Sequence, residues 1–198
     1  MLHEINLHAN RIVLVACGGA AVINLPGWIY ALNHLTKDIE LEVVLTHSAE
    51  RLVSKNALTT VLEKTPYTDA DLFSHEGKVL HCHLAEWPDF IIVAPLTLNT
   101  LSKSALLIAD TLATSILTMT SAPVYAALSF PERLNRNPTL TEYKEKLQKR
   151  KWMMFNQREA LALATKTTEK SGMMDFYNLL LQISNCRSTC LLYTSDAA

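Results

Sequence analysis

The stretch RIVLVACGGAAVINLPGWIYAL, residues 11–32, decides the fold. Residues 11–17 are apolar and rich in β-branched side chains, which is typical of a buried strand. Two glycines follow, and residues 20 to about 37 are expected to form a helix with Pro26 near its first turns. The glycines and the proline interrupt the apolar run, so we interpret it as a strand, a turn and a helix and not as a membrane helix.

The same alternation continues along the chain. Further apolar segments that are typical of buried strands occur at residues 41–46, 90–94, 124–128 and 152–155. Helical patterns occur at residues 48–58, 59–64, 98–119 (with a break near Asp110), 139–150 and 174–183. Because buried strands alternate with helices, we predict a single α/β domain over residues 1–189, a three-layer Rossmann-like or flavodoxin-like parallel sheet with helices on both faces.

The last residues, CLLYTSDAA at 190–198, differ in pattern from the rest of the chain. They show no helix-capping pattern and no core periodicity, and they resemble the translation of a transposon-end sequencing adapter read in one frame. We expect this segment to be a non-native tail, and we leave it out of the functional argument.

Charge and cysteine content exclude several classes of function. The net charge is −1 and no basic run is long, so we expect neither nucleic acid nor a membrane as a partner. The cysteines form no CxxC pair and no zinc spacing, which predicts no metal site and favours a reduced, cytoplasmic compartment. They are Cys17, Cys82, Cys186 and Cys190.

Two turns that follow predicted strands carry candidate ligand-binding groups. In CGGAA, Gly18 and Gly19 allow a phosphate or a ring to approach the backbone, and the next helix offers its first amides to an anion. In THSAE, the hydroxyls of Thr46 and Ser48 suit a phosphate. The alternatives are a tight strand–helix connection in the first turn and a helix cap by Ser48 in the second.

A third turn, APLTLNTLSK at residues 94–103, follows the most apolar strand. Thr97, Asn99 and Thr100 provide hydroxyls and an amide there, although helix capping by Thr97 or Asn99 is the alternative explanation. Because open parallel sheets bind ligands outside the carboxyl ends of their strands, we expect the three turns to face one crevice.

The His-Cys-His triplet at residues 81–83 precedes that strand. In an extended segment, His81 and His83 share one face and Cys82 takes the other, which argues against a metal site made by these three residues alone. Catalysis and a purely structural role both stay open for His81 on this pattern.

With these sites in this order, the chain resembles the flavin-containing cysteine decarboxylase family. That family includes phosphopantothenoylcysteine decarboxylase and the epidermin-type peptidyl-cysteine decarboxylases of lanthipeptide biosynthesis. The most specific match runs from His81 through the apolar strand to the motif P-x-x-x-N-T at residues 95–100, followed by Lys103 and Asp110, where the family also has a lysine and an aspartate.

The resemblance implies a cofactor and a set of site residues. His81 is then the active-site base, and FMN, with FAD as the alternative, is the cofactor. Ala20 stands where relatives often have a serine, which removes one hydrogen bond to the flavin. The implied flavin-binding residues are Gly18, Gly19, Ala20, Thr46, Ser48, Pro95, Thr97, Asn99 and Thr100.

The family signature P-x-M-N-x-x-M-W, whose asparagine orients the substrate carboxylate, is altered here. An ungapped alignment anchored on Asn137-Pro138 puts Pro131 at the asparagine position, whereas a shortened loop puts Asn135 there. We prefer Asn135 as the second catalytic residue, because an amide donates to a carboxylate and a proline does not.

The resemblance also implies a reaction. The thiol of a cysteine with a free carboxylate is oxidised to a thioaldehyde, carbon dioxide leaves, and an enethiol remains. Phosphopantothenoylcysteine decarboxylases then reduce the enethiol with a cysteine in a late flap, but residues 153–173 contain no cysteine. We therefore expect a precursor peptide ending in cysteine as the substrate, with decarboxylation of phosphopantothenoylcysteine or a non-catalytic flavin-binding regulatory role as the alternatives. The resemblance implies a homotrimer or a dodecamer of trimers.

Overall fold

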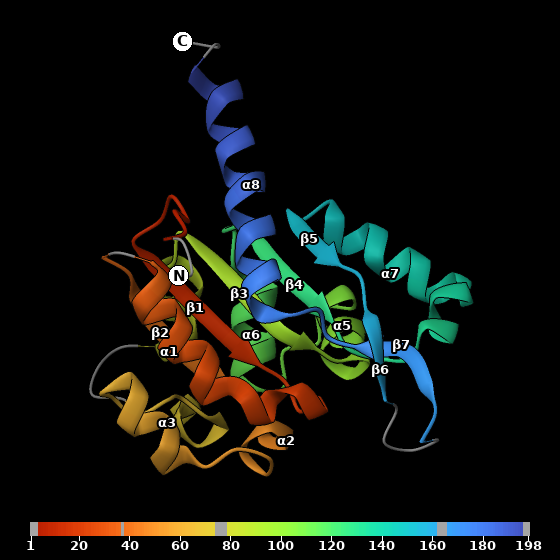
Figure 1. The fold of residues 1–198 in the computed structure, drawn as a ribbon, viewed down its shortest axis with the longest axis horizontal. Helices are drawn as coiled ribbons and strands as arrows, with labels where there is room; N and C mark the ends of the chain where they lie inside the picture. The colour runs from red at the N-terminus through yellow and green to blue at the C-terminus, as the bar shows by residue number, and fades with distance from the viewer. Residues whose placement is uncertain (1–3, 37, 74–78, 162–165, 196–198) are drawn as a thin grey trace.

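The computed structural model describes residues 4–36, 38–73, 79–161 and 166–195, and it has a central sheet with helices on both sides (Figure 1). Five parallel strands form this sheet in the order β2-β1-β3-β4-β5. They are β1 (Arg11–Ala16), β2 (Glu40–Leu45), β3 (Phe90–Leu96), β4 (Val124–Leu128) and β5 (Trp152–Phe155). The predicted fold class and all five predicted strands are confirmed.

Side chains of the sheet alternate between two cores. Along β1, Ile12 and Leu14 pack into one cluster, whereas Val13 and Val15 pack into the other. The first cluster is covered by α1 (Leu25–Leu35), α3 (Lys55–Leu62) and α8 (Phe176–Ser195). The second is covered by α4 (Leu80–Glu86), α5 (Leu98–Ala105), α6 (Leu112–Met119) and α7 (Pro138–Gln148). A sheet buried on both faces needs apolar side chains at successive positions, which explains the unbroken apolar runs.

Three local predictions differ from the structure. Residues 20–24 form a 3-10 helix, η1 (Ala20–Asn24), and the α-helix begins only at Leu25. The single helix predicted over residues 48–58 is two helices, α2 (His47–Glu50) and α3. The helix predicted to begin at Ser48 has Thr46 as its N-cap, which excludes the alternative that Ser48 is the cap. The predicted helix is divided into α2 and α3 because Ser54 starts a new helix by accepting a hydrogen bond from the amide of Ala57 (3.4 Å).

The extended conformation predicted for residues 81–83 is also wrong, because they lie in α4. Leu80 and Leu84, four residues apart, are buried on one face of this helix in the second core cluster. His81 is half-buried and His83 is exposed, and positions two apart on a helix do not share a face.

The remaining elements lie outside the five-stranded sheet. Two short 3-10 helices, η2 (Asp69–Phe73) and η3 (Glu132–Arg136), follow α3 and β4 along the chain. An antiparallel hairpin of β6 (Arg158–Leu161) and β7 (Thr168–Gly172) precedes α8. Helix α8 continues to Ser195 across the predicted boundary at residue 189, and residues 196–198 lie outside the described residues. Within the described ranges, no helix is long and apolar enough to cross a membrane.

Candidate functional site

A cavity of about 380 Å³ lies beyond the carboxyl ends of β1, β2 and β3. The strand order places it beside β1, where the connections switch direction, and this is the usual ligand position in an open parallel sheet. Six predicted flavin-binding residues line it: Gly18, Thr46, Ser48, Thr97, Asn99 and Thr100. Five further residues complete the lining: His47, Asp69, Lys103, Thr111 and Thr114. The structure therefore brings the three predicted turns together in one crevice.

The glycine turn allows the strand ends to approach one another closely. A Cβ on Gly18 would overlap the Cβ of Ser48 and lie 2.9 Å from its carbonyl carbon. A Cβ on Gly19 would lie 2.9 Å from Cγ of Pro95 and 3.0 Å from Oγ of Ser129. Both glycines are therefore required by packing, and Gly18 leaves a backbone surface open to a ligand in the cavity.

Groups suited to an anion are present at the start of α5. Thr97 is its N-cap, and its side chain makes no capping hydrogen bond, so the first amides of the helix are free of a capping side chain. Thr100 is buried one turn later, and the thiol of Cys17 donates a hydrogen bond to its Oγ1 (3.3 Å). Burial raises the pKa of Cys17, so this thiol stays protonated and keeps its hydrogen to donate. The start of α5 thus fits the phosphate of a phosphate-bearing cofactor.

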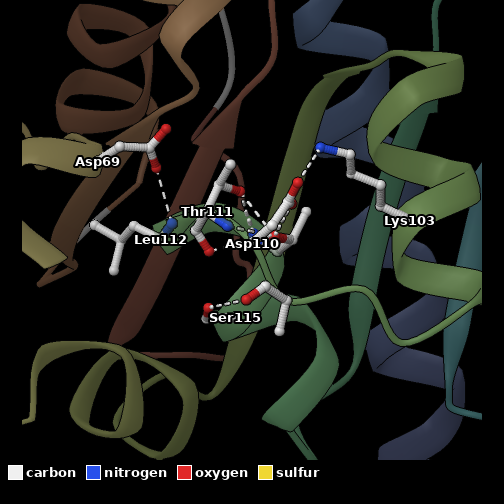
Figure 2. A network of polar contacts seen from close by, with 8 residues as sticks. Asp69, Lys103, Asp110, Thr111, Leu112 and Ser115 are labelled. Atoms are coloured by element: carbon white, nitrogen blue, oxygen red, sulfur yellow. Dashed lines mark hydrogen bonds and ion pairs between the residues drawn. The ribbon is translucent and has the colours of Figure 1, made fainter.

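One wall of the cavity is formed by α5 and α6, and a network of hydrogen bonds and an ion pair stabilises it (Figure 2). Lys103 donates to Asp110 (2.6 Å), and this hydrogen bond holds the pKa of Asp110 below its usual value. Thr111 and Thr114 form a capping box at the start of α6. Asp69 reaches from η2 to accept the amide hydrogen of Leu112 (2.8 Å). The spacing of Thr111 and Thr114 was a signal in the sequence for this cap, whereas the contribution of Asp69 was not visible there.

Arg150 ties the far ends of the same two helices together. Its guanidinium donates to the carbonyls of Ser104 (2.9 Å), Leu117 (2.8 Å) and Thr118 (2.8 Å). These carbonyls lie at the carboxyl ends of α5 and α6, where helices leave acceptors without partners. The amino ends that line the cavity are therefore held in a constant relative position.

His81 lies outside this cavity but at the same end of the sheet. Thr120, just after α6, donates to the carbonyl of Ala85 near the end of α4 (2.8 Å), so these two packed helices run in parallel. The first turn of α4, with His81, therefore lies at the end where Thr114 lines the cavity. Nδ1 of His81 is buried, and no hydrogen bond from the described residues reaches it.

Asn135 lies in a second cavity, of about 410 Å³, on η3. Its Oδ1 accepts a hydrogen bond from Lys144 (2.7 Å), and its Nδ2 donates to Gln157 (3.4 Å). Pro131, the alternative position for the family asparagine, is the N-cap of η3. One chain thus does not bring His81, Asn135 and the first cavity into a single enclosed site. Ala20 is exposed at the start of η1 and does not line either cavity.

Comparisons with known proteins agree with this geometry. Residues 2–187 match the family model described as Flavoprotein. The Coenzyme A biosynthesis bifunctional protein CoaBC of Borreliella burgdorferi is 31% identical over 140 residues, which are 70% of this chain and 35% of that protein. The probable phosphopantothenoylcysteine decarboxylase of Arabidopsis thaliana is 33% identical over 134 residues, 65% of this chain and 64% of that protein. The chain therefore spans about a third to two thirds of the length of these curated relatives.

Solved structures show the same fold. A PPC decarboxylase variant with a cysteine-to-serine change, complexed with pantothenoylaminoethenethiol, has a TM-score of 0.75 at 25% identity and covers 93% of this chain and 98% of that one. The FMN binding protein AtHal3 has a TM-score of 0.73 at 26% identity, with coverage of 96% and 98%. The epidermin biosynthesis protein EpiD of Staphylococcus aureus shares the fold, with a TM-score of 0.72 at 22% identity and coverage of 86% and 98%. As the resemblance in its sequence predicted, the chain belongs to the Flavoprotein family, whose members similar to it include flavin-dependent cysteine decarboxylases.

Proposed function

We propose that this chain binds FMN and catalyses the oxidative decarboxylation of a cysteine that carries a free carboxylate. The observation that carries the proposal is the cavity at the carboxyl ends of β1, β2 and β3, where six predicted flavin-binding residues meet. FMN is favoured over FAD because a similar solved structure is that of an FMN binding protein. Gly18, Ser48 and the start of α5 would hold the phosphate-bearing part of the cofactor.

Bound FMN would supply the two-electron oxidant for the substrate thiol. The residues of the chain would bind the substrate and move protons. His81 would accept the thiol proton, a role that suits an imidazole near neutral pH. The substrate loses two hydrogens to give a thioaldehyde, and the bond to the carboxylate then breaks, releasing carbon dioxide and leaving an enethiol. Asn135 would donate a hydrogen bond to the carboxylate.

The first candidate substrate is a precursor peptide that ends in cysteine, as in lanthipeptide-type biosynthesis. Residues 153–173, which include the β6–β7 hairpin, contain no cysteine that could reduce an enethiol. The similar PPC decarboxylase in which a cysteine is replaced by serine holds pantothenoylaminoethenethiol, in agreement with a reaction that ends at the enethiol.

The second candidate is phosphopantothenoylcysteine. Its support is the set of curated relatives, since the coenzyme A biosynthesis protein and the Arabidopsis decarboxylase are 31% and 33% identical to this chain. A non-catalytic flavin-binding role is the third outcome, motivated by the altered asparagine motif.

One experiment separates these functions. The purified protein is loaded with FMN and incubated separately with phosphopantothenoylcysteine and with a peptide ending in cysteine, and the products are analysed by mass spectrometry. Loss of carbon dioxide together with two hydrogens from the peptide supports the first function. Loss of carbon dioxide from phosphopantothenoylcysteine, with or without loss of two hydrogens, supports the second. FMN binding without turnover of either compound supports the regulatory role. A protein that does not bind FMN contradicts all three.

We further propose a homotrimer, or a dodecamer of trimers, located in the cytoplasm. The separation of Asn135 and His81 from the first cavity supports an assembly in which neighbouring chains complete each site. Light scattering on the purified protein measures the assembly. Cys17 and Cys82 form no disulfide, which agrees with a reducing compartment.

A further inference from the structure

Lys144, on α7, is a half-buried cation without a carboxylate partner among the described residues. Its Nζ donates to Oδ1 of Asn135 (2.7 Å) and lies 5.8 Å from the ring centroid of Phe130. Desolvation lowers the pKa of this ammonium. Removing an ammonium from water without a counter-ion is costly, so a bound anion would be favourable here.

The contact with Lys144 also decides how the amide of Asn135 is oriented. Because Lys144 has only donors, the oxygen of the amide must face it, and Nδ2 must point to the other side. There Nδ2 makes a long hydrogen bond to Oε1 of Gln157 (3.4 Å), whose own amide is held by the carbonyl of Phe130 (3.0 Å). A side-chain amide nitrogen has two hydrogens, so Asn135 can present a donor to a ligand.

The charges around the second cavity add up to an excess of positive charge. The lining has three cations and two carboxylates, and Lys144 beside it raises the excess from one to two. Lys170 lies 3.7 Å from Glu132, which pairs one cation with one carboxylate. An excess of positive charge in a concave site favours an anionic ligand. The charged lining residues are Glu132, Arg133, Arg136, Glu169 and Lys170.

We propose that Lys144 is a carboxylate-binding residue, which receives the free carboxylate of the substrate together with Nδ2 of Asn135. The ammonium has three donors and uses one for Asn135, so it can bind a carboxylate oxygen without leaving the asparagine. This inference rests on the proposed function and deepens it, because it names the group that selects an acid over its amide. It also gives the altered asparagine motif a second donor from a different element, α7.

The test compares an acid with its neutral amide. The probes are short peptides ending in serine, as the free acid and as the carboxamide, and the matching pair of pantothenoylserine compounds. Serine replaces cysteine so that the flavin cannot oxidise the probe. Equilibrium dissociation constants are measured on the FMN-loaded protein for the wild type, Lys144→Met, Lys144→Arg and Lys146→Met. Lys146 is the matched control, since it is an exposed lysine on the same helix.

We expect the wild type to prefer the acid of one pair, and Lys144→Met to lose about tenfold or more of that preference. Lys144→Arg should keep most of the preference, and Lys146→Met all of it. FMN affinity should stay unchanged in every variant, which separates loss of the carboxylate site from loss of fold. A purely structural lysine would change the affinity for acid and amide alike.

Two results would overturn the inference. One is a wild type that binds acid and amide equally in both pairs, and the other is a Lys144→Met variant that keeps the preference for the acid. Failure of the proposed function gives a different result. The wild type then turns over no cysteine compound, but it still prefers the acid to the amide, and this preference still depends on Lys144.

Discussion

Gly18 and Ser48 approach so closely that no side chain fits between them. A Cβ on Gly18 would overlap the Cβ of Ser48 and lie 2.9 Å from its carbonyl carbon. Both residues line the cavity at the carboxyl ends of the strands. The distance between the first two turns of the sheet is thus set by a glycine, and the cavity depends on that distance.

Gly18→Ala should therefore lower FMN affinity by at least about tenfold, because one backbone must move away from the other. The measurement is a fluorescence titration of the apoprotein with FMN. The control is Gly27→Ala on α1, where nothing lies within 4 Å of the added Cβ. This control should bind FMN normally and gain roughly 0.5–1 kcal/mol of unfolding free energy from the better helix propensity of alanine. Equal FMN affinity in both variants would contradict the packing argument.

His81→Asn should abolish decarboxylation and leave FMN binding intact, because the imidazole is proposed to move a proton and does not line the cofactor cavity. Activity is followed by mass spectrometry and FMN binding by absorbance. His83→Asn is the matched control, since His83 lies on the same helix and is exposed. Loss of FMN from His81→Asn would show that this histidine is structural, and our role for it would be wrong.

Asp110→Asn tests the ion pair with Lys103. The lowered pKa of Asp110 means that its charged form is favoured by folding, so its contribution is present above the ordinary aspartate pKa and is lost as the pH falls through the lowered pKa. The side chain of Asp110 is 50% exposed, so we expect a cost below about 1 kcal/mol at neutral pH. Urea unfolding should show the difference from the wild type shrinking as the pH falls below the ordinary aspartate pKa of about 4. Glu86→Gln, at an exposed site, is the control, and a difference that grows in acid would refute the sign.

Leu107 has a left-handed backbone, with φ of 58°, and is 63% exposed. Leu107→Gly should relieve roughly 1 kcal/mol of strain, which offsets the entropic cost of a glycine in the unfolded chain. Leu106→Gly is the matched control, because its φ of −95° carries no such strain. Denaturant unfolding should find Leu107→Gly more stable than Leu106→Gly by about 1 kcal/mol. Equal stabilities would mean that the strain is absent.

Local sequence pattern predicted the sheet because each strand is a short apolar run and each turn is rich in small or polar residues. The local pattern gave the wrong conformation for residues 81–83. They lie in a helix whose buried face is formed by Leu80 and Leu84, and the triplet alone does not show this spacing. The local pattern also predicted a helix start at Ser48, whereas Thr46 takes the N-cap position of α2. Both errors concern short segments, whose conformation is decided by what they pack against.

The amino-acid sequence by itself determined the parallel sheet and the three turns at its carboxyl edge, since apolar periodicity and glycine positions are local properties. Only the tertiary structure decided which groups meet. It brought Asp69 to the amide of Leu112 across 43 residues, and it placed Lys144 against Asn135. Such contacts depend on the packing of separate elements, and no local pattern encodes the distance between them.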